Sequence, residues 1–156
     1  LESQKTPSVI ALTRQNLPTV RGVSDENLCK RGAYILAGEA AAPIRLIASG
    51  SEVQLALAAR DLLAKDGLQS AVVSMPSWEL FGQQDGAYQR QVMGGDGTIR
   101  VACEAATGFG WERWLGAKGA FVGMKGFGAS AKASDLYKHF GITAEAIAEQ
   151  ARLLAR

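Results

Sequence analysis

The stretch "IRLIASGSEVQLALAARDLLAKDGLQSAVVSM", residues 44–75, predicts a strand, a helix and a second strand in succession. Ile44–Ala48 is a short apolar run bounded by a proline and a glycine, which is typical of a buried strand. Ala71–Met75 has the same character and ends at a proline. Parallel neighbouring strands cannot be joined by a tight hairpin and are usually connected through a helix. A strand, a helix and a strand in succession are therefore typical of two parallel neighbours. This unit predicts a parallel sheet.

The helix inside the unit carries recognisable signals at both ends. Ser49 or Ser51 is expected to cap its N-terminus, with Glu52 or Gln54 three residues later to complete a capping box. Gly67 stands where a left-handed C-terminal cap belongs. We therefore expect the helix to begin at Ser49 or Ser51 and to end at Gly67.

Further elements extend outward from this unit in alternating order. Strands are predicted at 10–13, 33–36, 99–103 and 120–123. Helices are predicted around 88–92, through 111–115, up to about 139, and from Thr143, whose neighbours Ile142 and Ile147 suit a hydrophobic staple. Alternation of this kind predicts a single α/β domain, with a largely parallel sheet covered on both faces.

Composition narrows the class of protein. The chain has 156 residues, of which 47% are hydrophobic and 21% charged, so a globular domain with a full core is expected. A net charge of +2 is too small to indicate a nucleic-acid or membrane surface. No apolar run reaches the ~18 residues of a membrane-spanning helix, and no signal peptide is recognisable. Cys29 and Cys103 fit no metal spacing, which indicates free thiols and a cytoplasmic location.

One glycine-rich triplet raises the question of a metal. A Gly-Asp-Gly that opens a helix and has an asparagine further along the chain holds a metal and a diphosphate in thiamine diphosphate enzymes. Here Gly95-Asp96-Gly97 precedes a strand, and the asparagines Asn16 and Asn27 both lie upstream. We interpret the triplet as a turn and expect no metal ligands in it.

Other motifs fall short of a site. The glycine pairs in 108–110 and 126–130 could accept an anion at a helix start, but neither completes a dinucleotide fingerprint, and tight turns explain both. Gly50-Ser51-Glu52 lacks the second glycine of a nucleophile elbow. The single histidine, His139, is expected at a helix C-terminus, where the dipole favours it. No self-contained catalytic site is predicted.

Arg14 is the remaining candidate. It follows the expected strand 10–13 and precedes Gln15 and Asn16, whose amides could hold it in place. A guanidinium presents a planar fork suited to a phosphate or a carboxylate. A surface salt bridge would use the same side chain, and the residues alone leave both roles open.

Several stretches together resemble the C-terminal domain of transketolase, in order and at suitable spacing over nearly the whole chain. They are "IALTRQNLP" (10–18), "RGAYIL" (31–36), "IASGSEVQLALAA" (47–59), "VVSMPSWELFGQQDGAY" (72–88) and "GFGASAKASDLYKHFGIT" (126–143). The resemblance implies a three-layer α/β/α fold around a mixed, mostly parallel sheet of five strands. We expect this domain to span 8–156, with 1–7 as a leading segment from a preceding domain or an added tag.

The resemblance also implies a function. Transketolases are homodimeric transferases of the pentose phosphate pathway that move a two-carbon ketol unit from a ketose phosphate to an aldose phosphate. Thiamine diphosphate and Mg²⁺ or Ca²⁺ are bound by two other domains, so no catalytic, cofactor or metal residue is expected here, and the isolated chain should be inactive. Arg14 matches the family arginine that binds the terminal phosphate of the substrate.

Two other readings stay open. Related domains serve as assembly modules in 2-oxo-acid dehydrogenases and deoxyxylulose phosphate synthases. The chain could also be a free-standing module that binds an anionic metabolite at 126–130.

The sequence departs from the transketolase pattern at two positions. Thr13 replaces the usual serine before the arginine, and Lys132 stands where proline is common.

Overall fold

A five-stranded sheet forms the centre of the protein, in a computed structural model that describes residues 5–22 and 26–156. The strands are β1 (Tyr34–Ala37), β2 (Ile44–Ala48), β3 (Ser70–Ser74), β4 (Ile99–Thr107) and β5 (Ala120–Met124). Their order across the sheet is β1-β3-β2-β4-β5. β1 runs antiparallel to β3, and the other neighbours are parallel. The predicted mixed, mostly parallel sheet is confirmed.

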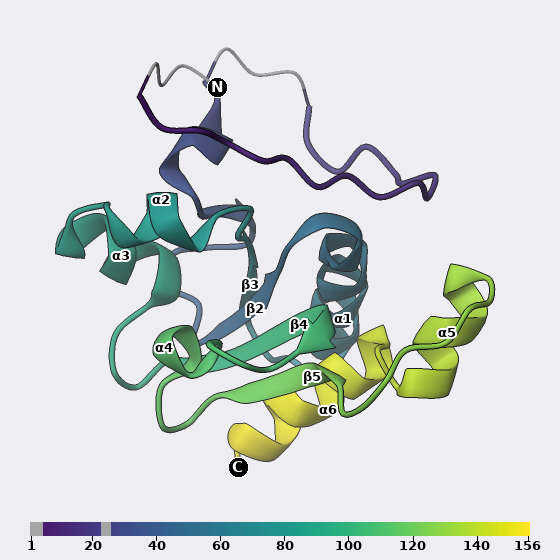
Figure 1. Ribbon diagram of the computed structural model, residues 1–156. Helices are drawn as coiled ribbons and strands as arrows, with labels where there is room; N and C mark the ends of the chain where they lie inside the picture. Colours follow the sequence, from purple (N-terminus) through teal and green to yellow (C-terminus); the bar gives the residue numbers. More distant parts are fainter. Residues whose placement is uncertain (1–4, 23–25) are drawn as a thin grey trace.

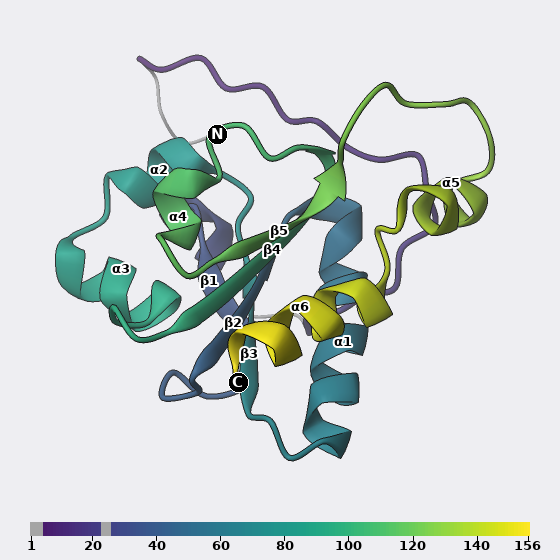
Figure 2. The same cartoon turned by 90° about the horizontal axis from the view of Figure 1, so that it is seen from below.

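Helices cover both faces of this sheet, as expected for three layers. The α-helices are α1 (Val53–Lys65), α2 (Trp78–Gly82), α3 (Gly86–Met93), α4 (Glu112–Leu115), α5 (Ala133–Phe140) and α6 (Ala144–Leu154), with 3-10 helices η1 (Leu28–Arg31) and η2 (Gly50–Glu52). In Figures 1 and 2, α2, α3 and α4 lie on one side of the strands and α1, α5 and α6 on the other. Among these, only α2 was missing from the expected helices.

The two cores follow from the alternation of side chains along the strands. Leu46 belongs to the cluster under α1 and α6, whereas its neighbour Ile47 belongs to the cluster under α2, α3 and α4. Every residue of β2 is buried, because this strand lies at the centre of the sheet with helices on both faces. The continuous apolar run of β2 is thus explained.

Arg45 interrupts that run with a charge, yet its side chain is fully buried. Its Nε donates to the carbonyl oxygen of Val92 at 2.8 Å, and its Nη1 donates to that of Ala42 at 2.6 Å. Burial lowers the pKa of Arg45, and the nearby charge of Arg100 lowers it further. The guanidinium thus ties β2 to the end of α3 through Val92 and to the loop before β2 through Ala42, and these bonds satisfy its buried donors.

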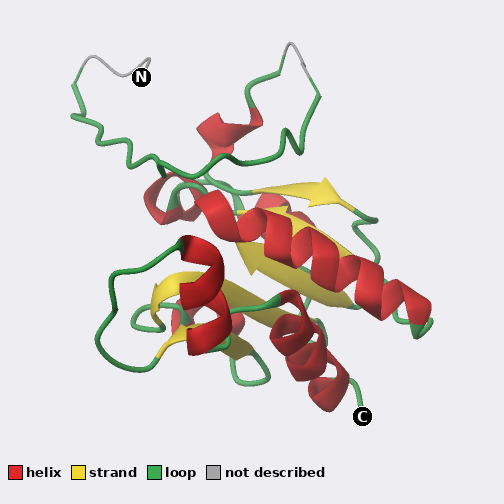
Figure 3. Ribbon diagram, turned by 90° about the vertical axis from the view of Figure 1, so that its right-hand side faces the viewer, coloured by secondary structure: helices red, strands yellow, loops and turns green. Residues whose placement is uncertain are grey.

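The predicted strand at 10–13 is wrong. Figure 3 shows this part of the chain as a loop outside the sheet, and within the described residues it pairs with no strand. Val9 is 97% exposed and Leu12 is 85% exposed. The local sequence favours an extended backbone, but a strand also needs a neighbouring strand to bond with, and residues 10–13 pair with neither of the edge strands β1 and β5.

The expected helix caps are confirmed at Gly67 and Thr143 and wrong at the start of α1. Gly67 has a φ of 75° and closes α1, and the hydroxyl of Thr143 accepts the amide of Ala146 at the start of α6. Neither Ser49 nor Ser51 caps α1, because a 3-10 turn intervenes and both hydroxyls bond to carboxylates instead.

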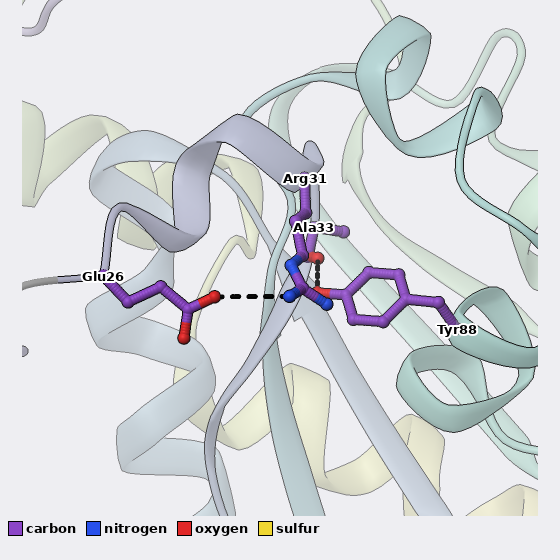
Figure 4. A network of polar contacts seen from close by, with 4 residues as sticks. All are labelled: Glu26, Arg31, Ala33 and Tyr88. Atoms are coloured by element: carbon purple, nitrogen blue, oxygen red, sulfur yellow. Dashed lines mark hydrogen bonds and ion pairs between the residues drawn. The ribbon is translucent and has the colours of Figure 1, made fainter.

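A small polar network anchors η1 beside α3 (Figure 4). The hydroxyl of Tyr88 donates to the carbonyl of Ala33 at 2.9 Å. Arg31 lies over the Tyr88 ring, with its guanidinium carbon 4.8 Å from the ring centre, and pairs with Glu26 at 3.3 Å. The segment leading into β1 is therefore tied to α3, on the face of the sheet that α2, α3 and α4 cover.

Nowhere in residues 5–22 or 26–156 does a helix reach the length and hydropathy needed to cross a membrane.

Candidate functional site

Arg14 lies at a bend in the extended segment before η1, and its side chain is exposed. Beside it, the backbone amide of Gln15 donates to Thr13 Oγ1 at 3.2 Å, which is a local bond within the bend. Within residues 5–22 and 26–156, no hydrogen bond or ion pair holds the guanidinium. The residue expected at a strand tip is therefore at a loop bend, with its fork open to solvent.

The bend is attached to the domain through one tyrosine. Gln15 Nε2 lies 3.5 Å from Tyr137 Oη, at the long end of the hydrogen-bonding range. Tyr137 comes from α5, and its hydroxyl also lies 3.1 Å from Ser51 Oγ and hydrogen-bonds Glu52 Oε1. Figures 1 and 2 both show the N-terminal segment reaching toward α5. Segments far apart in sequence thus meet beside Arg14.

Glu52 is the buried end of this network. Its residue is 5% exposed, and its Oε1 accepts the Ser51 hydroxyl at 2.7 Å as well as that of Tyr137. It lies directly before α1, where the positive end of the helix dipole stabilises a carboxylate. Burial raises the pKa of Tyr137; the bond from Gln15 lowers it, and the bond to Glu52 raises it again. Tyr137 therefore carries its proton at neutral pH.

A second carboxylate lies at the carboxyl ends of neighbouring strands. Glu104 Oε1 accepts the hydroxyl of Ser49 at 3.3 Å, and Oε2 accepts Trp111 Nε1 at 2.8 Å. Ser49 follows β2 and Glu104 lies in β4; from these two central strands the chain continues toward opposite edges of the sheet. Ligands of open α/β sheets bind at such switch points, so a ligand site is expected at the carboxyl ends of β2 and β4.

Cys103 lies between these carboxylates in β4 and is fully buried. Burial, together with the smaller effect of the charges of Glu52 and Glu104, raises the pKa of its thiol to about 12. A nucleophilic cysteine needs a lowered pKa and access to solvent, and Cys103 has neither. It is a packing residue of the core.

The glycine-rich segments behave differently from one another. At 95–97 the backbone forms a turn, with the Thr98 amide bonded to the Gly95 carbonyl at 3.0 Å, as interpreted from the sequence. Gly110 has a φ of 86° and lies against the ring of Trp78, so a tight turn is confirmed there. Around Gly126 and Gly128 there is open space, and the expected tight turn is wrong: this loop is exposed.

His139 lies in the last turn of α5, as expected, with its ring 4.8 Å from that of Phe140. Its side chain is exposed. Among the described residues, no three histidine, cysteine, aspartate or glutamate side chains gather in a way that could hold a metal ion.

A pocket of about 450 Å³ lies at the other end of the parallel strands, between the start of β3 and the end of α1. Arg60 Nε and Ser70 Oγ line this region without hydrogen-bond partners among the described residues. Each of these atoms exposes less than 1 Å², so a ligand in the pocket could not reach them. The pocket is remote from Arg14 and adds nothing to that site.

Sequence reasoning missed the residues that hold the bend. Tyr137 was read only as part of a helix, and Glu52 only as half of a capping box. A tyrosine in the amphipathic pattern of α5 was the available signal, since a half-buried tyrosine hydroxyl usually has a partner. Its partner could not be named, because Gln15 is 122 residues away in sequence.

Comparison with known proteins identifies the family. Residues 32–143 match the model of the Transketolase-like TK C-terminal domain. The chain is 52% identical to transketolase of Cereibacter sphaeroides over 153 residues, covering 97% of this chain and 23% of that protein. It is also 52% identical over 160 residues to transketolase of Sinorhizobium medicae, covering 100% and 23% respectively.

Solved structures agree with this. The crystal structure of the Pichia stipitis transketolase in complex with sedoheptulose 7-phosphate superimposes with a TM-score of 0.80 at 36% identity, covering 91% of this chain and 20% of that one. The chain thus spans about a quarter of the length of the curated relatives it matches. The family model, the identities and the shared fold together show that this chain belongs to the transketolase family and corresponds to its C-terminal domain.

Proposed function

We propose that the chain works as the C-terminal domain of a transketolase, and that Arg14 binds the terminal phosphate of the sugar substrate. The longer protein would transfer a two-carbon ketol unit from a ketose phosphate to an aldose phosphate in the pentose phosphate pathway. Identity of 52% to two transketolases over essentially the whole chain supports this reading over the assembly domain of another enzyme class and over a free-standing module.

The observation that carries the proposal is the state of Arg14. Its guanidinium is exposed and free of ion pairs within the described residues, while the next residue is attached to α5. A ready-made surface salt bridge, the competing role, is thus absent from this part of the chain. A fork held at a bend and left without a partner suits bidentate contact with a phosphate. The Pichia stipitis relative binds a sugar phosphate, which fits this ligand class.

The cofactor would be bound elsewhere. The family uses thiamine diphosphate with Mg²⁺ or Ca²⁺, but the residues described here do not fit that group: they gather no metal-binding cluster, and Gly95-Asp96-Gly97 is a turn before a strand. We propose that other domains of the longer protein hold the cofactor and that residues 8–156 provide phosphate contact and subunit contacts in a cytoplasmic homodimer.

The test uses the full-length natural polypeptide that contains these residues. Losing a charge-assisted contact of about 1.5–3 kcal/mol should raise the KM for a ketose phosphate about 10- to 150-fold in Arg14→Ala. The KM for an unphosphorylated ketose should stay within about twofold, because that substrate never made the contact.

Arg90→Ala is the matched control, since Arg90 is an exposed arginine on α3, on the far face of the sheet. It should leave both KM values unchanged. An equal rise for phosphorylated and unphosphorylated substrates in Arg14→Ala would remove Arg14 from the phosphate site.

A further inference from the structure

We infer that Tyr137 is a positioning residue for the substrate phosphate: it holds the bend that carries Arg14 through a directed chain of hydrogen bonds ending on buried Glu52. This inference rests on the proposed role of Arg14. It assigns a function to α5, which contributes no residue to that proposed contact. The chain of bonds joins Gln15, Tyr137 and Glu52, from three separate parts of the fold.

The bonds have a fixed direction. A tyrosine hydroxyl has one proton to donate, and Glu52 Oε1 is the acceptor for it. The proton of Tyr137 therefore points to Glu52, and the oxygen lone pairs remain free to accept Gln15 Nε2. Ser51 adds a second donor to Glu52 at 2.7 Å, which holds the carboxylate in place. Tyr137 thus presents an acceptor, and only an acceptor, to the bend.

The bend depends on this acceptor because its surroundings supply little else. Ile10 is 60% exposed and Leu12 is 85% exposed, so neither anchors the segment by burial. Among the hydrogen bonds described for residues 10–17, the bond to Tyr137 is the one that reaches another element of the fold. Arg14 is the immediate neighbour of Gln15, and the position of its fork follows that of the bonded amide.

Phosphate affinity should therefore respond to one oxygen atom on α5. In the full-length natural polypeptide, Tyr137→Phe keeps the ring and removes the hydroxyl. A neutral hydrogen bond of this length predicts a rise of about 2- to 5-fold in the KM for a ketose phosphate, with kcat and the KM for an unphosphorylated ketose unchanged. Gln15→Leu should give the same selective rise, and combining it with Tyr137→Phe should add no further effect.

Tyr88→Phe is the matched control, because the Tyr88 hydroxyl also makes a long-range bond, to the carbonyl of Ala33 beside η1. It should lower stability without changing the ratio of the two KM values. Equal KM changes for both substrates in Tyr137→Phe, or additive effects of Gln15→Leu, would overturn the positioning role.

The inference and the proposed function fail in different ways. If Arg14→Ala shows no selectivity for the phosphorylated substrate, the phosphate contact itself is wrong. If Arg14→Ala is selective and Tyr137→Phe leaves both KM values at the wild-type level, the contact stands and Tyr137 does not position it.

Discussion

The unit at 44–75 and the segment at 5–22 each contain a continuous apolar run, at 46–48 and at 9–12, yet the two runs lie in opposite environments. Ile47 and Leu63 are fully buried in the two cores, whereas Val9 and Leu12 lie almost fully in solvent. The central unit has strands and helices of this chain on both sides, whereas the segment contacts the domain through Gln15 at Tyr137 and through Arg21, which lies over the ring of Tyr34. Apolar residues therefore form regular structure only where the same chain buries them, and the proposed phosphate contact lies on a segment whose apolar residues stay exposed.

The largest expected effect compares two leucines. Leu63→Ala should lower the free energy of unfolding by about 2–5 kcal/mol, because it empties a fully buried site between α1 and the sheet. Leu12→Ala should change it by less than about 0.5 kcal/mol, since Leu12 is 85% exposed. Urea denaturation of the 156-residue chain measures both values. A comparable loss for Leu12→Ala would show that the segment packs onto the domain.

Two arginines sharpen the same contrast. Arg45→Met should lower the free energy of unfolding by about 2–3 kcal/mol, because the carbonyls of Val92 and Ala42 would lose their buried donors. Arg14→Ala should leave stability unchanged and act on substrate binding alone. Thermal unfolding measured beside the kinetic assay separates the two roles. A stable Arg45→Met variant would mean that water replaces the guanidinium.

The two cysteines should differ in how they affect the pH dependence of stability, because Cys103 is buried and Cys29 is exposed. Cys103 is buried with a pKa of about 12, so the folded protein keeps that proton, while the unfolded chain loses it above the usual cysteine pKa of 9.0. The unfolded state is then favoured as pH rises, and stability should fall between pH 9 and 12 by up to about 1.4 kcal/mol per pH unit.

Cys103→Ala should flatten that pH slope, and Cys29→Ala, at the exposed cysteine of η1, should not. Denaturation midpoints at pH 8, 9 and 10 test this. An unchanged slope in Cys103→Ala would assign the pH dependence to other groups, such as Tyr137, whose pKa is also raised.

The smallest expected effect contrasts a confirmed cap with an incorrect one. Thr143→Ala should lower the free energy of unfolding by about 1 kcal/mol, because it removes the acceptor for the Ala146 amide at the start of α6. Ser49→Ala removes only a 3.3 Å bond to Glu104 and should matter less. Equal losses in denaturation experiments would contradict the different roles assigned to the two hydroxyls.

Much of the domain could be read from local patterns. The run Ile44–Ala48 is a strand at its predicted bounds, and Gly67 and Thr143 end and begin helices as expected. Of the site, only Arg14 was named in advance, and that through a resemblance in the residues around it. α2 was missed because five residues are too few to display a helical period.

The sequence by itself determined the alternation of strands and helices, the bounds of the apolar strand β2 and the caps at Gly67 and Thr143, because each depends on residues within a few positions. Only the tertiary structure decided that residues 10–13 form no strand, that Ser49 serves Glu104, and that Tyr137 holds Gln15. Those contacts join residues 55 and 122 positions apart, and a hydrogen bond over that separation forms only once the packed layers have brought its two partners together.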